Sequence, residues 1–384
     1  MQLSDVIGND TLFPVRKKWR YFNHAGVSPM NTRGGDVLKH WVDAWQDDCI
    51  MGGDWFGKIP ELCGTTGRLI NGDPMQVALL KNTAEGISTV AFGLDWQRGD
   101  RIVINQSEYP ANQYPWLALE ERFGVEVVKV PEVANDDGSN RHVPTEAILA
   151  ALDDDRVKLC SVSHVQWSTG QRMDLPAIGG VCRKRGILFG VDAIQSLGVM
   201  PVDVEAAQCD FLWAGCHKWQ LGPMGVGVFW CRREVMDRVR PLSLGAFSVK
   251  DPFDWGTIDL TFENDARRYA CGTPNLSGFL VLLENHKLLH EIGIEPIYEH
   301  VTQLGDQFAA ALRDTQWVRV SPPAARSQIL TFTHPEADLD ALLVKLREEH
   351  HVELAVRSGR LRFSPHLHNT AQEVDQVAAI LRDV

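Results

Sequence analysis

Residues 209–231 read CDFLWAGCHKWQLGPMGVGVFWC and place a lysine just beyond an apolar strand. The runs 211–213 and 226–230 each predict a buried strand. His217 and Lys218 lie between them, followed by a turn that is rich in glycine. Lysine is among the residues least often fully buried, so this position needs a chemical reason.

Short apolar runs alternate with helix-like segments from residue 77 to residue 230. Strands are predicted for VALLKN, RIVINQ, VEVVKV, VKLCSVSHV, ILFGVD, FLWAGC and VGVFWC, and helices for intervening segments such as TEAILAAL. Continuous apolar strands that alternate with helices indicate a parallel sheet covered on both faces. We therefore expect the α/β fold class, with a mainly parallel seven-stranded sheet.

The pattern changes after about residue 255. Two long amphipathic segments, 277–293 and 294–315, predict helices, and shorter strands and helices follow them. A chain of 384 residues also exceeds the usual size of a single hydrophobic core. We predict a large domain over residues 23–255 and a small α+β domain formed by residues 1–22 and 256–384.

Composition narrows the function classes. The chain is 44% hydrophobic and 23% charged, as expected of a globular protein. Its net charge of −12 disfavours a nucleic-acid partner. No apolar run is long enough to cross a bilayer, and the start of the chain does not resemble a signal peptide. The eight cysteines include no CxxC pair, so we expect reduced thiols and a cytoplasmic protein.

Two strand ends carry polar groups suited to a ligand, because ligands bind beyond the carboxyl ends of parallel strands. The segment NTAEG begins a helix, whose free N–H groups suit a phosphate, although Thr83 could equally be an N-cap. Asp192 directly follows ILFGV, and Gln195 comes three residues later. A buried carboxylate is costly unless it meets a cation, so Asp192 is either an N-cap or the partner of a protonated ring nitrogen.

Lys218 completes this set. Free lysine has a pKa of about 10.4, and desolvation would lower it and free the amine as a nucleophile. A lysine that forms a Schiff base, an aspartate and a phosphate-binding helix start are the groups that bind pyridoxal phosphate. We therefore predict pyridoxal 5′-phosphate as the cofactor, with a solvated lysine as the structural alternative.

The motifs NTAEG, SEYPAN, SHVQWSTG, VDAIQSLG, GCHKW, GPMGVG and CGTPN occur in this order and together resemble the class V aminotransferases. This fold-type I pyridoxal-phosphate family includes cysteine desulfurases, kynureninase and isopenicillin N epimerase. The resemblance extends from residue 21 to residue 377. It implies an aminotransferase or lyase that acts on an amino acid.

The resemblance also implies roles for the matching residues. The expected cofactor-binding residues are Thr83, Ala84, Tyr109, Asp192, Gln195, His217, Lys218 and Thr273, and the expected substrate-binding residues are Arg362, His24 and Ala25. Lys218 matches the Schiff-base lysine, Asp192 the partner of the pyridinium nitrogen and Tyr109 the stacking ring, so these three are expected to be catalytic. Thr273 lies in a turn that resembles one reaching across a dimer interface, which implies a homodimer with a shared active site.

Three departures from the family pattern bear on the reaction. Desulfurases carry a sulfur-accepting cysteine on a loop before the carboxylate-binding arginine, but here that segment is only LAVRSGRLRFS, and no cysteine follows Cys271. Tyr109 replaces a histidine, and Gly215 replaces a phosphate-binding serine. Transamination, C–S or β-elimination chemistry and epimerisation all remain open, with a non-catalytic pyridoxal-phosphate protein as the alternative. A nicotinamide enzyme is disfavoured because GPMGVG precedes a strand.

Histidine pairs give a weaker signal. His286 and His290 share a helix face, and PHLH (365–368) contains two more histidines. No third ligand is evident beside the helical pair, which favours packing, and no metal site is predicted. The PHLH segment is close to Arg362 in sequence and is a candidate lining of the substrate pocket.

Overall fold

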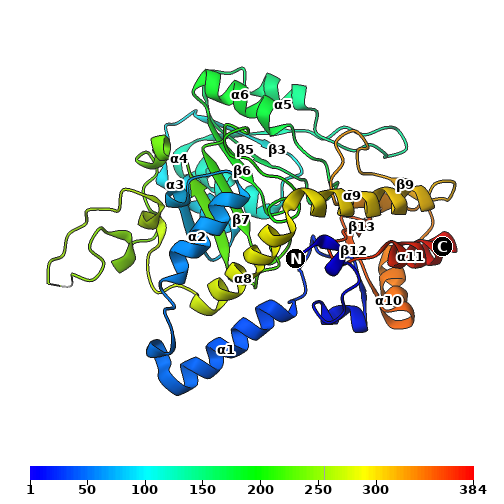
Figure 1. Ribbon diagram of the computed structural model, residues 1–384. Helices are drawn as coiled ribbons and strands as arrows, with labels where there is room; N and C mark the ends of the chain where they lie inside the picture. Colours follow the sequence, from blue (N-terminus) through cyan, green and yellow to red (C-terminus); the bar gives the residue numbers. More distant parts are fainter. Residues whose placement is uncertain (255) are drawn as a thin grey trace.

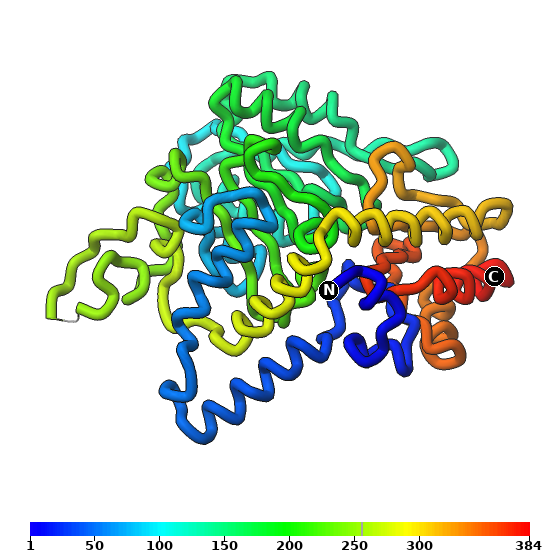
Figure 2. The backbone as a smooth tube through the Cα atoms, viewed as in Figure 1, coloured from blue at the N-terminus to red at the C-terminus, as the bar shows by residue number. Residues whose placement is uncertain are grey.

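The structure is a computed structural model and describes residues 1–254 and 256–384. A large sheet with helices on both sides forms the main body, and the C-terminal elements pack at one side of it (Figure 1). The same view as a tube shows the N-terminal residues lying against the C-terminal part (Figure 2). None of the helices in the described residues has the length and apolar character needed to cross a membrane.

The central sheet has seven strands in the order β2-β8-β7-β6-β5-β3-β4. Its strands are β2 (Val77–Leu80), β3 (Arg101–Asn105), β4 (Glu126–Val130), β5 (Val157–Ser163), β6 (Leu188–Asp192), β7 (Phe211–Gly215) and β8 (Gly227–Cys231). Strand β8 is antiparallel to both of its neighbours, and the other pairs are parallel. Every predicted strand is present, and the predicted α/β class is confirmed.

Helices cover both faces of this sheet. One face packs on α2 (Lys58–Leu69), α5 (Thr145–Ala151), α6 (Leu175–Arg185) and α8 (Leu276–Ile292), and the other on α3 (Thr83–Gly93), α4 (Tyr114–Phe123) and α7 (Arg233–Met236). Ile102 and Ile104 belong to the second cluster, whereas Val103 between them belongs to the first. Side chains of a strand alternate between faces, so the continuous apolar runs fill two cores.

A smaller sheet has the order β12-β13-β10-β9. It consists of β9 (Val318–Arg319), β10 (Leu330–Thr333), β12 (Ala355–Arg357) and β13 (Arg360–Phe363), and packs on α9 (Ile294–Ala311), α10 (Leu339–His350) and α11 (Ala371–Arg382). Strand β1 (Arg20–Tyr21) pairs in parallel with β11 (Val352–Glu353). This pair joins the start of the chain to its C-terminal part.

The remaining helices are peripheral. Helix α1 (Thr32–Asp48) packs along α8 and extends below the main body (Figure 1). Short 3₁₀ helices occur at Leu3–Asp5, Pro14–Lys17, Cys49–Gly52, Pro74–Gln76, Pro110–Asn112, Ala246–Ser248 and Ala266–Tyr269.

The predicted domain division stays a prediction. Its boundary at residue 255 lies outside the described residues. The structure adds that Phe279, Leu282 and Leu283 of α8 share a hydrophobic cluster with the large sheet. Helix α8 therefore packs with the first unit, although it follows residue 255 in the chain.

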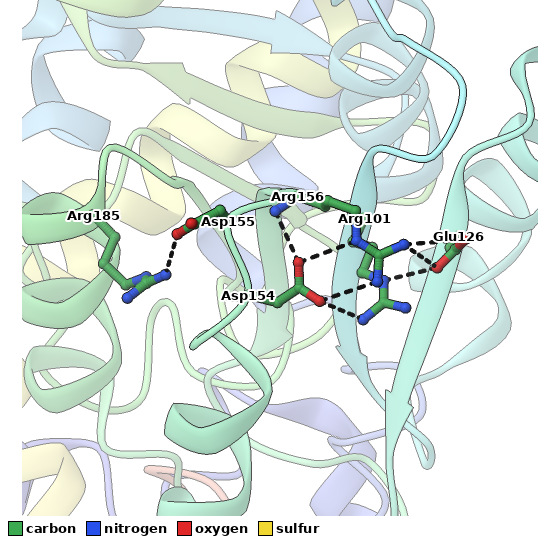
Figure 3. A network of polar contacts seen from close by, with 6 residues as sticks. All are labelled: Arg101, Glu126, Asp154, Asp155, Arg156 and Arg185. Atoms are coloured by element: carbon green, nitrogen blue, oxygen red, sulfur yellow. Dashed lines mark hydrogen bonds and ion pairs between the residues drawn. The ribbon is translucent and has the colours of Figure 1, made fainter.

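Charged side chains join the strands at their amino ends. Arg101, at the start of β3, pairs with Glu126 at 2.7 Å and with Asp154 at 2.6 Å, as Figure 3 shows. Arg156 also contacts Asp154, and Arg185 of α6 pairs with Asp155. This network lies at the edge opposite the carboxyl ends, which leaves those ends to form the site.

Candidate active site

The carboxyl edge of the sheet brings the predicted residues together. Strands β6 and β7 are neighbours, so Asp192 at the end of β6 pairs in register with Trp213, and Lys218 follows the end of β7. Because β8 is antiparallel, its first residue, Gly227, lies at the same edge between Gly215 and Leu80. The start of α3, just beyond Leu80, therefore joins the site.

Lys218 is held by its backbone and has a free amine. Its carbonyl oxygen accepts hydrogen bonds from Ser28 Oγ and from the Leu221 N–H, the latter at 3.0 Å. The side chain is 8% exposed, and no residue in the described part of the chain forms a hydrogen bond with its Nζ. Burial lowers the pKa of Lys218, and the nearby Arg362 lowers it further, while Asp192 opposes the shift. This amine is therefore prepared to act as a nucleophile.

Asp192 is a buried acid with little stabilisation of its charge. It is 1% exposed, and its Oδ1 accepts a hydrogen bond from the Ile194 N–H at 3.0 Å. Burial raises the pKa of Asp192, and the neighbouring Glu108 raises it further. A protonated ring nitrogen would supply the missing positive charge, so this acid fits the pyridine ring of pyridoxal phosphate.

Tyr109 covers the lysine with an exposed ring. The ring is 48% exposed, and its centroid lies 5.8 Å from Lys218 Nζ. The edge of Trp167 supports it, with a centroid distance of 5.5 Å and an interplanar angle of 82°. An aromatic face left open above a buried amine fits a stacked pyridine ring.

The first turn of α3 provides an anion site at this edge. Asn82 is the N-cap of α3, because its Oδ1 accepts a hydrogen bond from the Glu85 N–H at 2.9 Å. The alternative that Thr83 is the N-cap is therefore wrong. Thr83 and Ala84 lie in the first turn, and Thr83 Oγ1 accepts a hydrogen bond from the Gly215 N–H at 2.8 Å. The position suits a phosphate, and the predicted phosphate contact of these residues stays a prediction.

Glycines make room for this arrangement. A Cβ at Gly227 would lie 2.9 Å from the backbone nitrogen of Asn82. The strand can therefore approach the start of α3 this closely only because residue 227 is glycine. A Cβ at Gly215 would lie 3.2 Å from His217 Cε1. Burial and Lys218 lower the pKa of His217 to about 4, so its imidazole is neutral. His217 can therefore offer a neutral N–H group on this side of the site.

Arg362 is a buried cation, and no acid in the described part of the chain pairs with it. It is 2% exposed, its Nη1 donates to the Trp167 carbonyl at 3.1 Å, and its Nη2 to Asn23 Oδ1 at 3.5 Å. Its Nε has no hydrogen-bond partner, and burial lowers its pKa to about 9. A guanidinium in this setting fits a carboxylate, which would restore its charge balance.

Gln195, His24 and Ala25 lie close to this site but bond to protein groups. Gln195 Nε2 donates to the Ala25 carbonyl at 3.1 Å, and its Oε1 accepts from Trp219 Nε1 at 2.8 Å. His24 is fully buried, and its Nδ1 lies 2.8 Å from Ser28 Oγ. Their predicted binding roles remain predictions.

Thr273 lies in a different environment from the residues around Lys218. It is exposed and lines a cavity of about 570 Å³ together with Lys81, Gly225 and aromatic side chains such as Phe247. Lys81 and Gly225 place this cavity next to the start of α3. The predicted contact of Thr273 with a partner subunit's cofactor stays a prediction.

The histidine pairs act in packing. His286 lies 3.1 Å from Thr65 Oγ1 and 3.0 Å from Gln220 Oε1, and His290 lies 2.9 Å from the Thr65 carbonyl. Among the described residues, no group of three or more His, Cys, Asp or Glu is arranged to hold a metal ion. His366 and His368 of PHLH pack around His24, each with a centroid distance of 5.0 Å.

Two contributors were not found from the sequence: Ser28 holds the Lys218 backbone, and the Trp167 carbonyl orients Arg362. Asn23, which contacts the same guanidinium, belongs to the segment NHAG (23–26), which the family resemblance predicts to line the substrate pocket. A backbone carbonyl has no signature in the sequence, so the role of residue 167 needed the structure.

A buried amine, an uncompensated acid and an open aromatic ring at one edge of an α/β sheet define a pyridoxal-phosphate enzyme. The sequence model of the family Aminotransferase class-V matches residues 64–377, and the chain belongs to this family. Its members use pyridoxal phosphate, which confirms the predicted cofactor and enzyme class.

Relatives and solved structures agree with this assignment. A probable cysteine desulfurase from Methanothermobacter thermautotrophicus is 30% identical over 85% of this chain and 84% of its own length. Another, from Pyrococcus abyssi, is 29% identical over 85% and 83%. A cystine C–S lyase in complex with cysteine persulfide has a TM-score of 0.89 and 24% identity, covering 97% of this chain and 99% of its own. The apo cysteine desulfurase of Thermococcus onnurineus has a TM-score of 0.88 and 21% identity, covering 99% and 97%.

Proposed function

We propose that this enzyme is a C–S lyase: it binds an amino acid at Lys218, removes the Cα proton and expels a sulfur group from Cβ. The observation that carries the proposal is the free, buried Lys218 amine beneath Tyr109, with the neighbouring Cys216 fully buried. Relatives named cysteine desulfurase and a structural neighbour named cystine C–S lyase support C–S chemistry.

Some of these residues would hold the cofactor, and others would act on the substrate. When bound, pyridoxal phosphate supplies an electron-withdrawing ring that makes the Cα proton of an attached amino acid acidic. Lys218 would hold the cofactor covalently and, once released, would take the Cα proton through its Nζ. Asp192 would keep the ring nitrogen protonated. Thr83 and Ala84 would hold the phosphate, and the buried Arg362 would bind the α-carboxylate.

The sulfur is expected to leave without a bond to the protein. Storage of a persulfide requires a reactive thiolate near the substrate. Cys216, beside His217, is fully buried, and burial raises its pKa strongly. Burial likewise raises the pKa of Cys63, to about 12, and the chain has no cysteine after Cys271. A direct release of sulfide or persulfide follows from this distribution.

The test combines trapping of the lysine with a cysteine series. Borohydride should fix the cofactor to Lys218 in the wild type, and Lys218→Ala should lose both the adduct and turnover while it stays folded. Lys184→Ala, an exposed lysine on α6, is the control and should behave as the wild type. An adduct on any other lysine would refute the assignment.

Each of the eight cysteines is then changed to serine. All variants should keep the rate of the chemical step within about tenfold, or roughly 1.4 kcal/mol of barrier. If one variant folds and binds cofactor normally but no longer cleaves cysteine, sulfur passes through a protein thiol, and a desulfurase is the better description.

We further propose that the active enzyme is a homodimer. Exposed apolar side chains gather on segments near the cavity that Thr273 lines: Phe253 is 71% exposed and Ile258 96% exposed. The 3₁₀ helix that follows α1 adds Met51, which is 82% exposed. Large exposed apolar side chains grouped on one part of a surface are typical of a protein–protein interface.

A further inference from the structure

One face of the small sheet carries three arginines. In the antiparallel pair β12–β13, Ala355 lies opposite Arg362, and Arg357 lies opposite Arg360. Side chains alternate along a strand, so Arg357, Arg360 and Arg362 point to the same side. Val356 and Leu361 point to the other side, into the hydrophobic cluster of α9, α10 and α11.

This arginine-bearing face looks toward the active site. Arg362 reaches the Trp167 carbonyl, in the loop that follows β5. Arg357 is its diagonal neighbour across the strand pair, and such neighbours have Cβ atoms roughly 7–8 Å apart. The Arg357 cation lowers the pKa of both Lys218 and Arg362, which places it on the same side of the site.

Arg357 has no acidic partner of its own. Its Nη1 donates to the Val356 carbonyl at 2.8 Å, and no ion pair among residues 1–254 and 256–384 includes it or Arg362. Glu353, a nearby acid, is already bound by Arg347 at 2.7 and 2.9 Å. Two neighbouring guanidinium groups repel each other, so an arrangement without acids favours a ligand with two negative groups.

Arg360 differs from Arg357 although it belongs to the same turn. Glu132 acts on Arg360 and opposes the lowering of its pKa by burial. Glu132 in turn contacts Arg141 at 3.5 Å. Arg360 therefore has an acidic neighbour away from Lys218, which makes it a matched control for Arg357.

We propose that Arg357 sets substrate specificity by binding a second carboxylate, on the side chain of the amino acid whose α-carboxylate Arg362 binds. The inference rests on the proposed function and names its substrate class: amino acids with a distal carboxylate, including disulfide-linked ones such as cystine. Arg357 is exposed, as expected of a residue at the mouth of the site that meets the far end of a long substrate.

The first experiment compares substrates. Dissociation constants are measured by spectral titration with cystine, aspartate and glutamate, and with the neutral alanine, serine and S-methylcysteine. Steady-state rates are measured with cystine and S-methylcysteine, the two that carry a C–S bond. Arg357→Ala should raise the dissociation constants of the first group, and KM for cystine, about ten- to hundredfold, the range expected for one charge-assisted hydrogen bond. Values for the neutral group should change less than about twofold. Arg357→Lys should restore part of the loss, because it keeps the charge but not the planar fork.

The control and a second readout separate this inference from the proposed function. Arg360→Ala should leave the dissociation constants of both groups of amino acids unchanged. Succinate and acetate binding are measured by calorimetry, which needs no turnover, and Arg357→Ala should weaken only succinate. A wild type that prefers the neutral group, or an Arg357→Ala variant that weakens both groups equally, overturns the inference. If the proposed function is wrong, borohydride gives no cofactor adduct on Lys218, whether or not succinate binds.

Discussion

At the scale of single residues, the site is defined by ionisable groups that are buried without ion-pair partners among the described residues. Lys218, Asp192 and Arg362 are each no more than 8% exposed, yet none forms an ion pair with another described residue. Isolated buried charges destabilise a fold, so their presence together indicates groups that a ligand completes. In the proposed function, pyridoxal phosphate and an amino acid would supply those complements.

The pH dependence of cofactor binding tests the state of Lys218. Burial and Arg362 lower its pKa to about 7, so the amine is neutral above that pH, whereas a solvated lysine stays charged up to about pH 10. The rate at which the apoprotein forms an imine with pyridoxal phosphate should therefore rise between pH 6 and 8 and then level off. Stopped-flow absorbance gives this profile. A rate that keeps rising to pH 10 would show a solvated lysine instead.

Asp192→Asn tests the buried acid. The amide keeps the shape and can still accept the Ile194 N–H, but it cannot balance a protonated ring nitrogen. We expect turnover to fall about ten- to hundredfold, the effect of one strong charge-assisted interaction. Rates are compared at equal cofactor occupancy, measured by absorbance, and Asp192→Glu should retain more activity. Equal rates in all three proteins would exclude the assigned role.

At the scale of elements, the loop after β5 connects the two sheets. Trp167 supports Tyr109 with its ring and Arg362 with its carbonyl. Gly170 in the same loop has a φ of +71°, and a Cβ there would overlap the backbone oxygen of Ile329. The loop is thus held in place by close contact with β10, which adjoins the strand of Arg362.

Gly170→Ala should disturb this loop and the carboxylate site with it. Gly186 is the matched control, because its φ is +70° but nothing lies within 4 Å of a Cβ. Gly186→Ala should lower the free energy of unfolding by about 1 kcal/mol, the cost of a left-handed residue. Gly170→Ala should cost about 3 kcal/mol and raise KM about tenfold. Urea unfolding measures the free energy of unfolding, and steady-state kinetics measure KM. Identical values for the two variants would contradict the prediction.

At the scale of the whole molecule, exposed apolar side chains support the proposed homodimer. The segments that carry Met51, Phe253 and Ile258 project from the main body on one side (Figure 1). Large exposed apolar side chains that lie near one another are typical of a surface that another protein covers. They lie on the side of the cavity that Thr273 lines.

Sedimentation should therefore show a dimer, and Ile258→Asp should weaken it. A charge placed in an apolar interface costs several kcal/mol, so the dissociation constant should rise at least about a hundredfold. The cofactor should also bind less tightly if Thr273 completes the partner's site. Val344→Asp, on the distant α10, is the control because Val344 is 52% exposed there. A monomeric wild type with full cofactor occupancy would refute the proposal.

The sequence by itself determined the sheet and the main chemical groups. All seven strands follow from apolar runs, because a strand buried on both faces must be apolar throughout. Lys218, Asp192 and the start of α3 follow from their positions at strand ends, where parallel topology brings ligand-binding groups together.

Only the tertiary structure decided what lies around these groups. The roles of the Trp167 carbonyl and Ser28 depend on contacts between segments far apart in the chain. Arg357 and Arg362 belong to one hairpin, but the approach of Arg362 to Trp167 depends on how the small sheet packs on the large one. Backbone carbonyls look alike in every sequence, and the charge balance of an arginine depends on which acids reach it. For that reason the cofactor was predictable from local patterns, whereas the orientation of the substrate groups was set by how the small sheet packs against the large one.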